Sequence, residues 1–187
     1  MLYDSGQTYS GRAYRDCIGS AHAHRVPIVI ARRGMRWSAG DGVTLDILAP
    51  AKPFLAETGD DVNENSIVAM LHYGAYRELF MGDAGEDSEA RLLAWGDDLR
   101  ADVLKVGHHG SQYASTVPFI SVVHPKAAVV SVGRHNTFGH PAPSTIATLE
   151  QSGARVFRTD RCGAVTITES TISTIGGCPD PSSMDDR

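Results

Sequence analysis

Short apolar runs that end at glycine, proline or aspartate constrain this chain more than any other feature of its sequence. The runs span residues 26–31, 43–50, 66–74, 78–83, 102–107, 127–133, 154–159 and 163–168. They are short and rich in β-branched residues, so each of them predicts a β-strand. The chain is therefore expected to fold around sheet rather than as a bundle of helices.

Three stretches between or before these runs have the pattern of helices. Residues 88–97 and 143–153 are predicted helices, and residues 10–24 form a third candidate. Ser144 and Gly153 flank the second stretch as its expected N-cap and C′ residues.

The order of these elements predicts the fold class. Strands joined by hairpins in one half, followed by strands that alternate with helices, indicate a layered α/β domain. We place this domain at residues 1–175. Residues 176–187 are rich in Pro, Ser and Asp and are expected to be a disordered tail.

Composition excludes several classes of protein. The chain has 187 residues, 42% of them apolar, which is enough for one domain with a hydrophobic core. The formal net charge of −5 gives no overall attraction to nucleic acid, so any such contact would be local. No run approaches the roughly 20 apolar residues that span a bilayer.

The expected location of the chain, from these signals alone, is the cytoplasm. No basic and apolar leader follows Met1. The three cysteines, Cys17, Cys162 and Cys178, are an odd number without metal-binding spacing. They do not predict a disulfide framework, and reduced thiols are expected.

Three strand ends carry side chains suited to metal or phosphate chemistry. In the first, ELFMGDAGEDSE, Asp83 follows an apolar strand and Gly82 and precedes a helix. A carboxylate in this position can bridge two divalent cations. Since Gly-Asp is also common in turns, an ordinary turn residue remains the alternative.

The second strand end is DVLKVGHHGS. On an extended backbone, His108 and His109 point to opposite faces, so one would bind metal while the other donates to a substrate oxygen. Gly110 lets the backbone approach a ligand, and Ser111 adds a hydroxyl donor. A buried structural histidine is the usual explanation for one such residue, but it explains two in tandem less well.

The third strand end is SVGRHNTFGHP, residues 131–141. Asn136 and His140 lie in a loop with two glycines, and Pro141 restricts His140 to an extended backbone. Loops held at strand ends are common places for binding and catalytic residues. The alternative is a turn that packs His140 structurally.

Taken in order, these elements resemble a known domain. The stretches DSGQTY, NENSIVAML, FMGDA, LKVGHHGS, SVGRHNTFGHP and VFRTDRCGAVTI follow one another as in the metallo-β-lactamase-fold domain of ComEC-type DNA-uptake proteins and related stand-alone hydrolases. The resemblance covers residues 2–168. It implies the fold class α/β (α+β), arranged as a metallo-β-lactamase-like αββα sandwich.

The resemblance also implies a metal-dependent hydrolase of phosphoester bonds with two divalent metals, zinc or manganese. In that pattern Asp83 is a bridging metal ligand and His109 is a ligand of the second metal. His108 and His140 are catalytic residues that face the substrate phosphate. Two cations would lower the pKa of a bound water and hold phosphate oxygens for in-line attack, and histidine would assist the leaving group.

One signature of that family, the HxHxDH stretch that supplies four ligands ahead of DSGQTY, does not occur in the 187 residues. His22 and His24 form His-x-His without the following Asp-His, and we interpret them as the polar end of a surface helix. Asn63 and Asn65 stand near the place of a middle histidine ligand. The sandwich is thus expected to be incomplete at its N-terminus, to bind one metal or none by itself, and to expose an apolar sheet face to a missing N-terminal segment or a second copy.

The sequence leaves three functions open. The first is a ComEC-like nuclease that acts during DNA uptake, outside the cytoplasmic membrane, on a phosphoester substrate such as single-stranded DNA. The second is an inactive remnant that serves as an interaction module, and the third is a phosphodiesterase for small molecules. Ser111 and Asn136 would bind phosphate oxygens or orient the loops. Either local basic patches or ordinary solvated charge would explain Arg32, Arg33, Arg36, Lys105 and Arg134.

Overall fold

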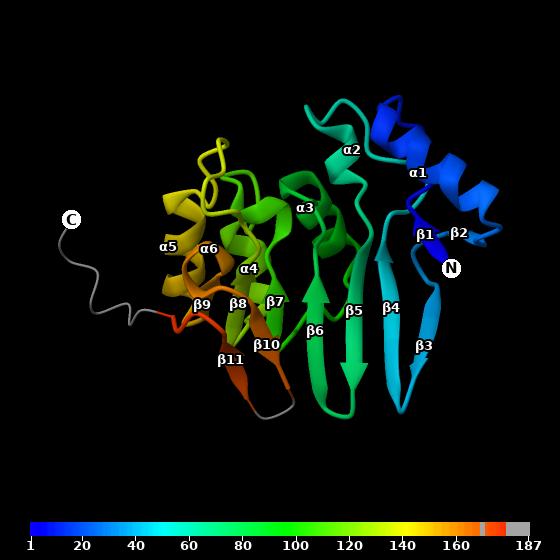
Figure 1. Cartoon of the computed structure of the whole chain (residues 1–187). Helices are drawn as coiled ribbons and strands as arrows, with labels where there is room; N and C mark the ends of the chain where they lie inside the picture. Colours follow the sequence, from blue (N-terminus) through cyan, green and yellow to red (C-terminus); the bar gives the residue numbers. More distant parts are fainter. Residues whose placement is uncertain (169–170, 179–187) are drawn as a thin grey trace.

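A mixed sheet of seven strands forms the centre of the computed structural model, which describes residues 1–168 and 171–178 (Figure 1). In sheet order the strands are β3 (Arg36–Gly40), β4 (Val43–Ala49), β5 (Val68–Tyr73), β6 (Tyr76–Phe80), β7 (Val103–Lys105), β8 (Ala127–Val130) and β9 (Arg155–Arg158). Strands β3 to β6 pair antiparallel, and β6 to β9 pair parallel. The carboxyl ends of β6, β7 and β8 therefore lie at one edge of the sheet.

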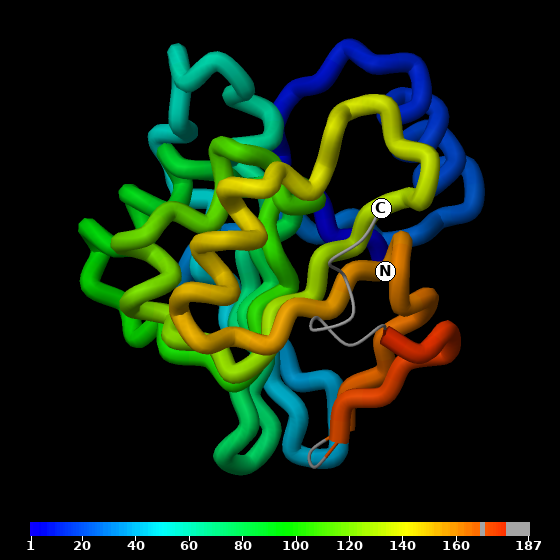
Figure 2. Tube along the Cα trace, turned by 90° about the vertical axis from the view of Figure 1, so that its left-hand side faces the viewer, coloured from blue at the N-terminus to red at the C-terminus, as the bar shows by residue number. Residues whose placement is uncertain are grey.

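Three helices cover one face of this sheet, as Figures 1 and 2 show from two sides. They are α3 (Glu86–Trp95), α4 (Val117–Val123) and α5 (Pro143–Gln151), and each lies between two parallel strands because parallel pairing needs a crossover connection. Their apolar side chains form the main core with the sheet. Leu79, Leu104, Leu92, Phe119 and Leu149 are fully buried there.

The other face of the sheet is covered only toward its two sides. A hairpin of β10 (Val165–Ile167) and β11 (Ile172–Thr174) packs on β7, β8 and β9. Near the opposite side, β1 (Leu2–Asp4) pairs with β2 (Ile28–Ile30), and the ring of Tyr3 stacks on Trp37 at 3.7 Å between centroids. The helix α1 (Arg12–Ala23) joins β1 to β2.

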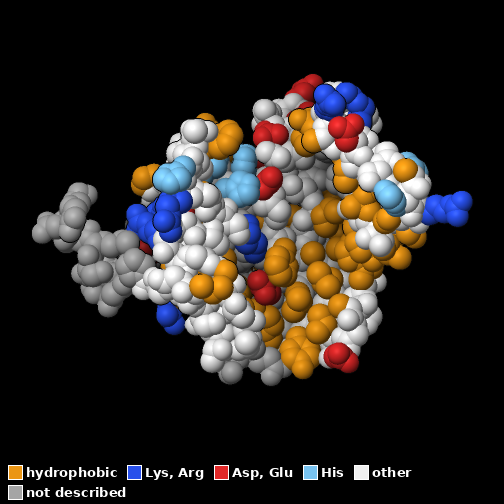
Figure 3. All heavy atoms as spheres, in the orientation of Figure 1, with side chains coloured by type: hydrophobic (Ala, Val, Ile, Leu, Met, Phe, Trp, Pro, Cys, Tyr) orange, Lys and Arg blue, Asp and Glu red, His pale blue; other side chains and the backbone are white. Residues whose placement is uncertain are grey.

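Between these coverings the sheet presents an open apolar face over β4, β5 and β6. Figure 3 shows hydrophobic side chains gathered there. Val43, Leu45, Leu71 and Phe80 are only partly buried, and Tyr73 is exposed. This is the kind of uncovered sheet face that the sequence predicts for an incomplete sandwich.

The predicted elements are present with small changes at their ends. Each of the eight apolar runs overlaps a strand, and the three predicted helices correspond to α1, α3 and α5. The predicted N-cap at Ser144 is wrong: α5 begins at Pro143 after Ala142, because proline is preset for the first helical position. Gly153 follows the end of α5 with a φ of +87°, in agreement with its predicted role.

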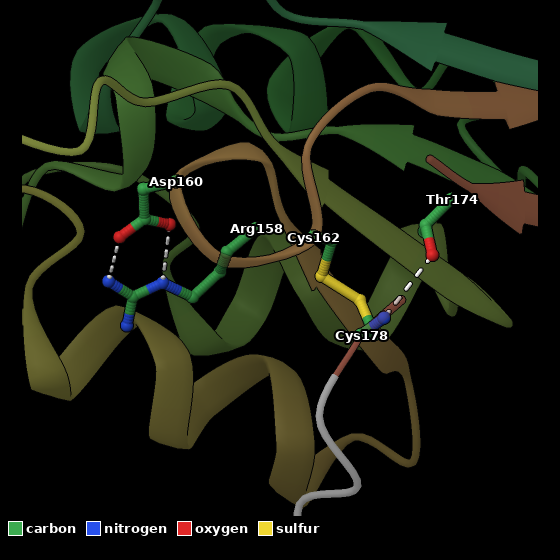
Figure 4. The surroundings of a disulfide bond; sticks show 5 residues. All are labelled: Arg158, Asp160, Cys162, Thr174 and Cys178. Carbon is green, nitrogen blue, oxygen red and sulfur yellow. Dashed lines mark hydrogen bonds and ion pairs between the residues drawn. A yellow bond between two sulfur atoms is a disulfide. The ribbon is translucent and has the colours of Figure 1, made fainter. Parts of the chain in front are cut away.

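Cys162 and Cys178 form a disulfide, so the expectation of reduced thiols is wrong for this pair (Figure 4). Cys162 ends the short helix α6 (Thr159–Cys162), and Cys178 follows β11. The hairpin of β10 and β11 reverses the chain and brings the two residues together. Cys17 is free and exposed.

The bond also affects the expected disordered tail, because Cys178 lies within residues 176–187. Residues 179–187 lie outside the described residues. Within the described ranges, no helix is long and apolar enough to cross a membrane.

Candidate active site

The loops that follow β6, β7 and β8 meet at one edge of the sheet and bring four predicted site residues together. His109 Nε2 lies 3.5 Å from Asp83 Oδ1. The ring centroid of His108 lies 6.4 Å from that of His109 and 5.6 Å from that of His140. Figure 3 shows histidine side chains gathered at this edge beside the open face. The convergence that the sequence predicts is therefore present, while the chemical role of each residue stays a prediction.

The backbone at His108 and His109 differs from the extended conformation that the sequence analysis assumes. Both residues lie in a tight turn over Gly107–Gly110 with left-handed conformations, at φ 43° and ψ 45° for His108 and φ 54° and ψ 22° for His109. For residues other than glycine this conformation costs roughly 1–2 kcal/mol each. The turn brings both imidazoles to the same edge, whereas an extended strand would separate them.

Close approach of the loops explains a glycine in this turn. Gly110 has a φ of +80°, and a Cβ atom there would lie 2.6 Å from Cβ of Pro141. Its carbonyl accepts a hydrogen bond of 2.8 Å from Ala142 N. The HHGS turn is thus packed directly against the loop that carries His140.

Hydrogen bonding places one proton of His109. Its Nδ1 lies 2.7 Å from the carbonyl oxygen of Ser131, which can only accept, so Nδ1 carries the proton. In the neutral ring, Nε2 then presents a lone pair to Asp83 Oδ1. Two acceptors that face each other at 3.5 Å repel unless a proton or a metal cation lies between them.

This pair has the chemistry of two ligands of one cation. Histidine ligands of metals commonly donate their second N–H to a backbone carbonyl, as His109 does to Ser131. Ligand bonds of about 2.0–2.2 Å in a tetrahedral site place neighbouring donor atoms about 3.3–3.6 Å apart, which matches the 3.5 Å between His109 and Asp83. Within residues 1–168 and 171–178, however, no group of three or more His, Cys, Asp or Glu side chains is arranged to hold a metal.

Asp83 and His108 are positioned by residues that precede β5. Ser66 Oγ accepts a 3.1 Å hydrogen bond from the backbone N–H of Asp83. Asn63 Nδ2 lies 3.4 Å from His108 Nε2 and donates to Asp60 Oδ2 at 2.7 Å. Asn63 therefore belongs to this cluster through its contact with His108.

Asn65, the second asparagine near the expected histidine ligand, has a structural role. It is 1% exposed, and its side chain bonds to the backbone of Leu55 and Asp61. It closes the loop around α2 (Asp61–Glu64).

The loop with His140 is closed by Asn136. The Asn136 side-chain oxygen accepts from His140 N at 3.0 Å, and its amide nitrogen donates to His140 O at 2.8 Å. Burial lowers the pKa of His140, and the charges of His108 and His109 lower it further. Both effects favour the neutral form of its imidazole.

Ser111 lies beneath the site rather than in it. The residue is 3% exposed, its Oγ accepts from Tyr113 N at 3.3 Å, and its carbonyl accepts from Thr145 Oγ1 at 2.8 Å. Of the two roles left open for Ser111 and Asn136, these contacts favour orientation of the loops.

Two buried carboxylates hold the site loops from below, and neither is evident from the sequence. Glu64 accepts from Gly85 N and Ser88 N, just after Asp83. Glu89 accepts from the backbone N–H groups of Ser115 and Thr116 and from the Thr116 hydroxyl. Burial raises the pKa of Glu89 to about 7.

Three of the basic residues named in the sequence analysis have polar partners in the structure. Arg33 pairs with Asp97, and Arg36 with Asp46. Lys105 donates to its neighbour's carbonyl at 2.9 Å, and burial lowers the pKa of its ammonium group while the charge of Asp83 opposes that shift. For Arg33 and Arg36 these contacts favour ordinary paired charge, whereas Lys105 is partly buried.

Beside the histidines lies a cavity of about 390 Å³. Its lining consists of His109, Ser131, Val132, Gly133, Asn136, Phe138, His140 and Thr159.

His22 and His24 are exposed at the end of α1, which confirms that they form the polar end of a surface helix.

The fold belongs to the metallo-β-lactamase-like class. The fold resembles the crystal structure of a proposed metal-dependent hydrolase from Parabacteroides distasonis, with a TM-score of 0.51 and 14% identity over 80% of this chain and 62% of that one. No family model matches the chain.

Within that class, the chain is a homologue of ComEC-type competence proteins. It is 33% identical to ComE operon protein 3 of Bacillus subtilis over 119 residues, which are 64% of this chain and 15% of that protein. It is also 33% identical to Competence protein ComA of Neisseria gonorrhoeae over 131 residues, 70% of this chain and 18% of that protein. Recombination protein 2 of Haemophilus influenzae is 33% identical over 108 residues, or 56% and 13%. The chain matches less than a fifth of the length of each relative.

Proposed function

We propose that this chain is the phosphate-contacting part of a metal-dependent phosphoester hydrolase in a DNA-uptake protein. The observation that carries the proposal is the pair of His109 and Asp83, whose facing acceptors at 3.5 Å leave a place for a cation or a proton between them. His108 and His140 lie next to this pair at the same edge. Competence proteins among the relatives support DNA as the source of the phosphoester.

Asp83 and His109 would hold the metal, zinc or manganese. Such a cation supplies Lewis acidity and lowers the pKa of a bound water. Catalytic zinc sites usually have three protein ligands, and the described residues provide two. We therefore expect weak binding by this chain alone, and a second metal would need donors beyond the described residues.

The remaining residues bind and orient the substrate. In the neutral form of His140, which burial favours, one ring nitrogen donates a hydrogen bond to a phosphate oxygen while the other accepts. His108 lies between His109 and His140 and contacts the same phosphate. Asn136 keeps the His140 backbone in place through its two hydrogen bonds.

A direct test measures hydrolysis of bis-p-nitrophenyl phosphate and of end-labelled single-stranded DNA by the purified chain. We expect activity only when Zn²⁺ or Mn²⁺ is in large excess over protein, because two donors bind a cation weakly. The matched control replaces His22 and His24 by alanine, which removes two exposed imidazoles away from the site. Hydrolysis that persists in a metal chelator would contradict the proposal.

A second candidate function is an inactive module that binds another protein. Two observations favour it: the HxHxDH stretch is absent from the 187 residues, and the sheet face over β4 to β6 is open and apolar. Absence of hydrolysis with both metals, together with unchanged folding, would favour this function over the first.

The disulfide bears on location, and we propose that the domain functions outside the cytoplasmic membrane. Disulfides persist in oxidising compartments and are rare in the cytosol. Alkylation of denatured protein taken directly from cells is expected to label one cysteine, Cys17, and to leave Cys162 and Cys178 unlabelled. Labelling of all three would show that the cell keeps the pair reduced. Prior reduction of the sample provides the control, because it must give three labels.

A further inference from the structure

Phe138 is 81% exposed, although a phenylalanine side chain gains about 1.5–3 kcal/mol when it is buried. A single exposed apolar residue needs no explanation by itself. Phe138 differs from a scattered surface residue because it lines the cavity beside His109 and His140.

The Phe138 ring is exposed to solvent at the tip of a closed turn. The two hydrogen bonds between the Asn136 side chain and the His140 backbone fasten both ends of a five-residue loop. Phe138 is the middle residue of that loop. Its position at the tip is therefore fixed by Asn136 rather than by packing of the ring itself.

The ring of Phe138 is nearly parallel to that of His140. Their planes differ by 17°, and their centroids lie 6.0 Å apart. A flat group that stacks on the exposed Phe138 ring would thus lie beside the imidazole expected to contact phosphate. A nucleotide has this combination, a flat base joined to a phosphate, and simple phosphoesters lack the base.

Charge gives an independent reason to look for stacking. The chain has a formal net charge of −5, and Arg33 and Arg36 are paired with aspartates. The net charge therefore gives no overall attraction to the phosphate backbone, which dominates many nucleic-acid complexes. Stacking of bases on aromatic rings does not depend on net charge and contributes about 1–3 kcal/mol per base.

We propose that Phe138 is a base-stacking residue that gives the site its preference for single-stranded nucleic acid over phosphoesters without a base. Single strands are the substrate because their bases are free to leave the stack, whereas duplex bases are not. The inference rests on the proposed function, since it takes the histidine cluster as the phosphate site.

The test compares the binding of two labelled oligonucleotides of equal length, oligothymidylate and its abasic counterpart, by fluorescence anisotropy without added metal. The unchanged chain is expected to bind oligothymidylate about 5- to 150-fold more tightly, which corresponds to one stacked base. Phe138→Leu, which keeps apolar bulk without a ring, should remove this preference. Phe138→Trp should retain it.

Ile175→Ala is the matched control, because Ile175 is 83% exposed and does not line the cavity. Its preference for oligothymidylate should equal that of the unchanged chain. Equal binding of both oligonucleotides by the unchanged chain, or a preference that survives in Phe138→Leu, would overturn the inference. Failure of the proposed hydrolase function would give a different result. The unchanged chain would then not hydrolyse bis-p-nitrophenyl phosphate, but it would still prefer oligothymidylate to the abasic oligonucleotide.

Discussion

Replacing Asp83 by asparagine is expected to lower metal-dependent hydrolysis of bis-p-nitrophenyl phosphate at least about 100-fold, because electrostatic stabilisation by a bound cation is worth several kcal/mol. The substitution keeps the shape of the side chain but removes its negative charge. A neutral amide would face the His109 Nε2 lone pair and could satisfy it by donating an N–H. The requirement for a cation at this place would then disappear.

A second measurement separates chemistry from folding in this experiment. Asp83 is half exposed, and its backbone N–H bond to Ser66 does not depend on the carboxylate. The unfolding temperature of Asp83→Asn should therefore stay close to that of the unchanged chain. Asp16→Asn removes an exposed carboxylate on α1 and serves as the control with full activity. Equal rates in Asp83→Asn and Asp16→Asn would show that Asp83 has no part in the reaction.

The free energy of unfolding is expected to fall by about 3 kcal/mol between pH 5 and pH 8 through the ionisation of Glu89 alone. Glu89 is 1% exposed, and burial raises the pKa of its carboxyl group to about 7. In the unfolded chain a glutamate has a pKa of about 4.3. Between these two values the folded state holds a proton that the unfolded state has released, so a rise in pH favours unfolding.

Glu89→Gln tests this expectation, because glutamine cannot ionise and should remove the Glu89 contribution to the slope. Urea unfolding of both proteins at pH 5 and pH 8 measures the difference. The donors that face Glu89 come from Ser115 and Thr116, and the nearby Glu64 carboxylate raises its pKa further. Glu150→Gln, on the exposed side of α5, is the matched control and should keep the slope of the unchanged chain. Parallel pH profiles for Glu89→Gln and the unchanged chain would contradict the assignment.

The buried strands of the sheet were predictable because each consists mainly of consecutive apolar residues. Residues 127–130 are apolar without interruption, and every residue of β8 is buried; residues 103–107 contain one charged residue, Lys105, which is the partly buried residue of β7. Strand β3 has no such apolar run. Its sequence is RWSAG, and it lies at the edge of the sheet with most residues exposed. Its pairing with β4 depends on a hairpin rather than on its own pattern.

The candidate site was predictable where residue type and position at a strand end coincide, as at Asp83 and His140. Glu89 was not, since EDSEARLL has the pattern of an exposed first turn of a helix, and only the folded chain places the loop after the HHGS turn over it. The disulfide was missed for the same kind of reason. Sequence spacing does not show that the hairpin of β10 and β11 returns Cys178 to Cys162.

The left-handed backbone at His108 and His109 affects which residues selection would keep at these two positions. Glycine adopts this conformation freely, so a glycine at either position would relieve roughly 1 kcal/mol or more of strain while deleting an imidazole. If variants of the protein were selected only for thermal stability, glycine should accumulate at positions 108 and 109. The two histidines would be kept only if the variants were also selected for a function that needs these side chains.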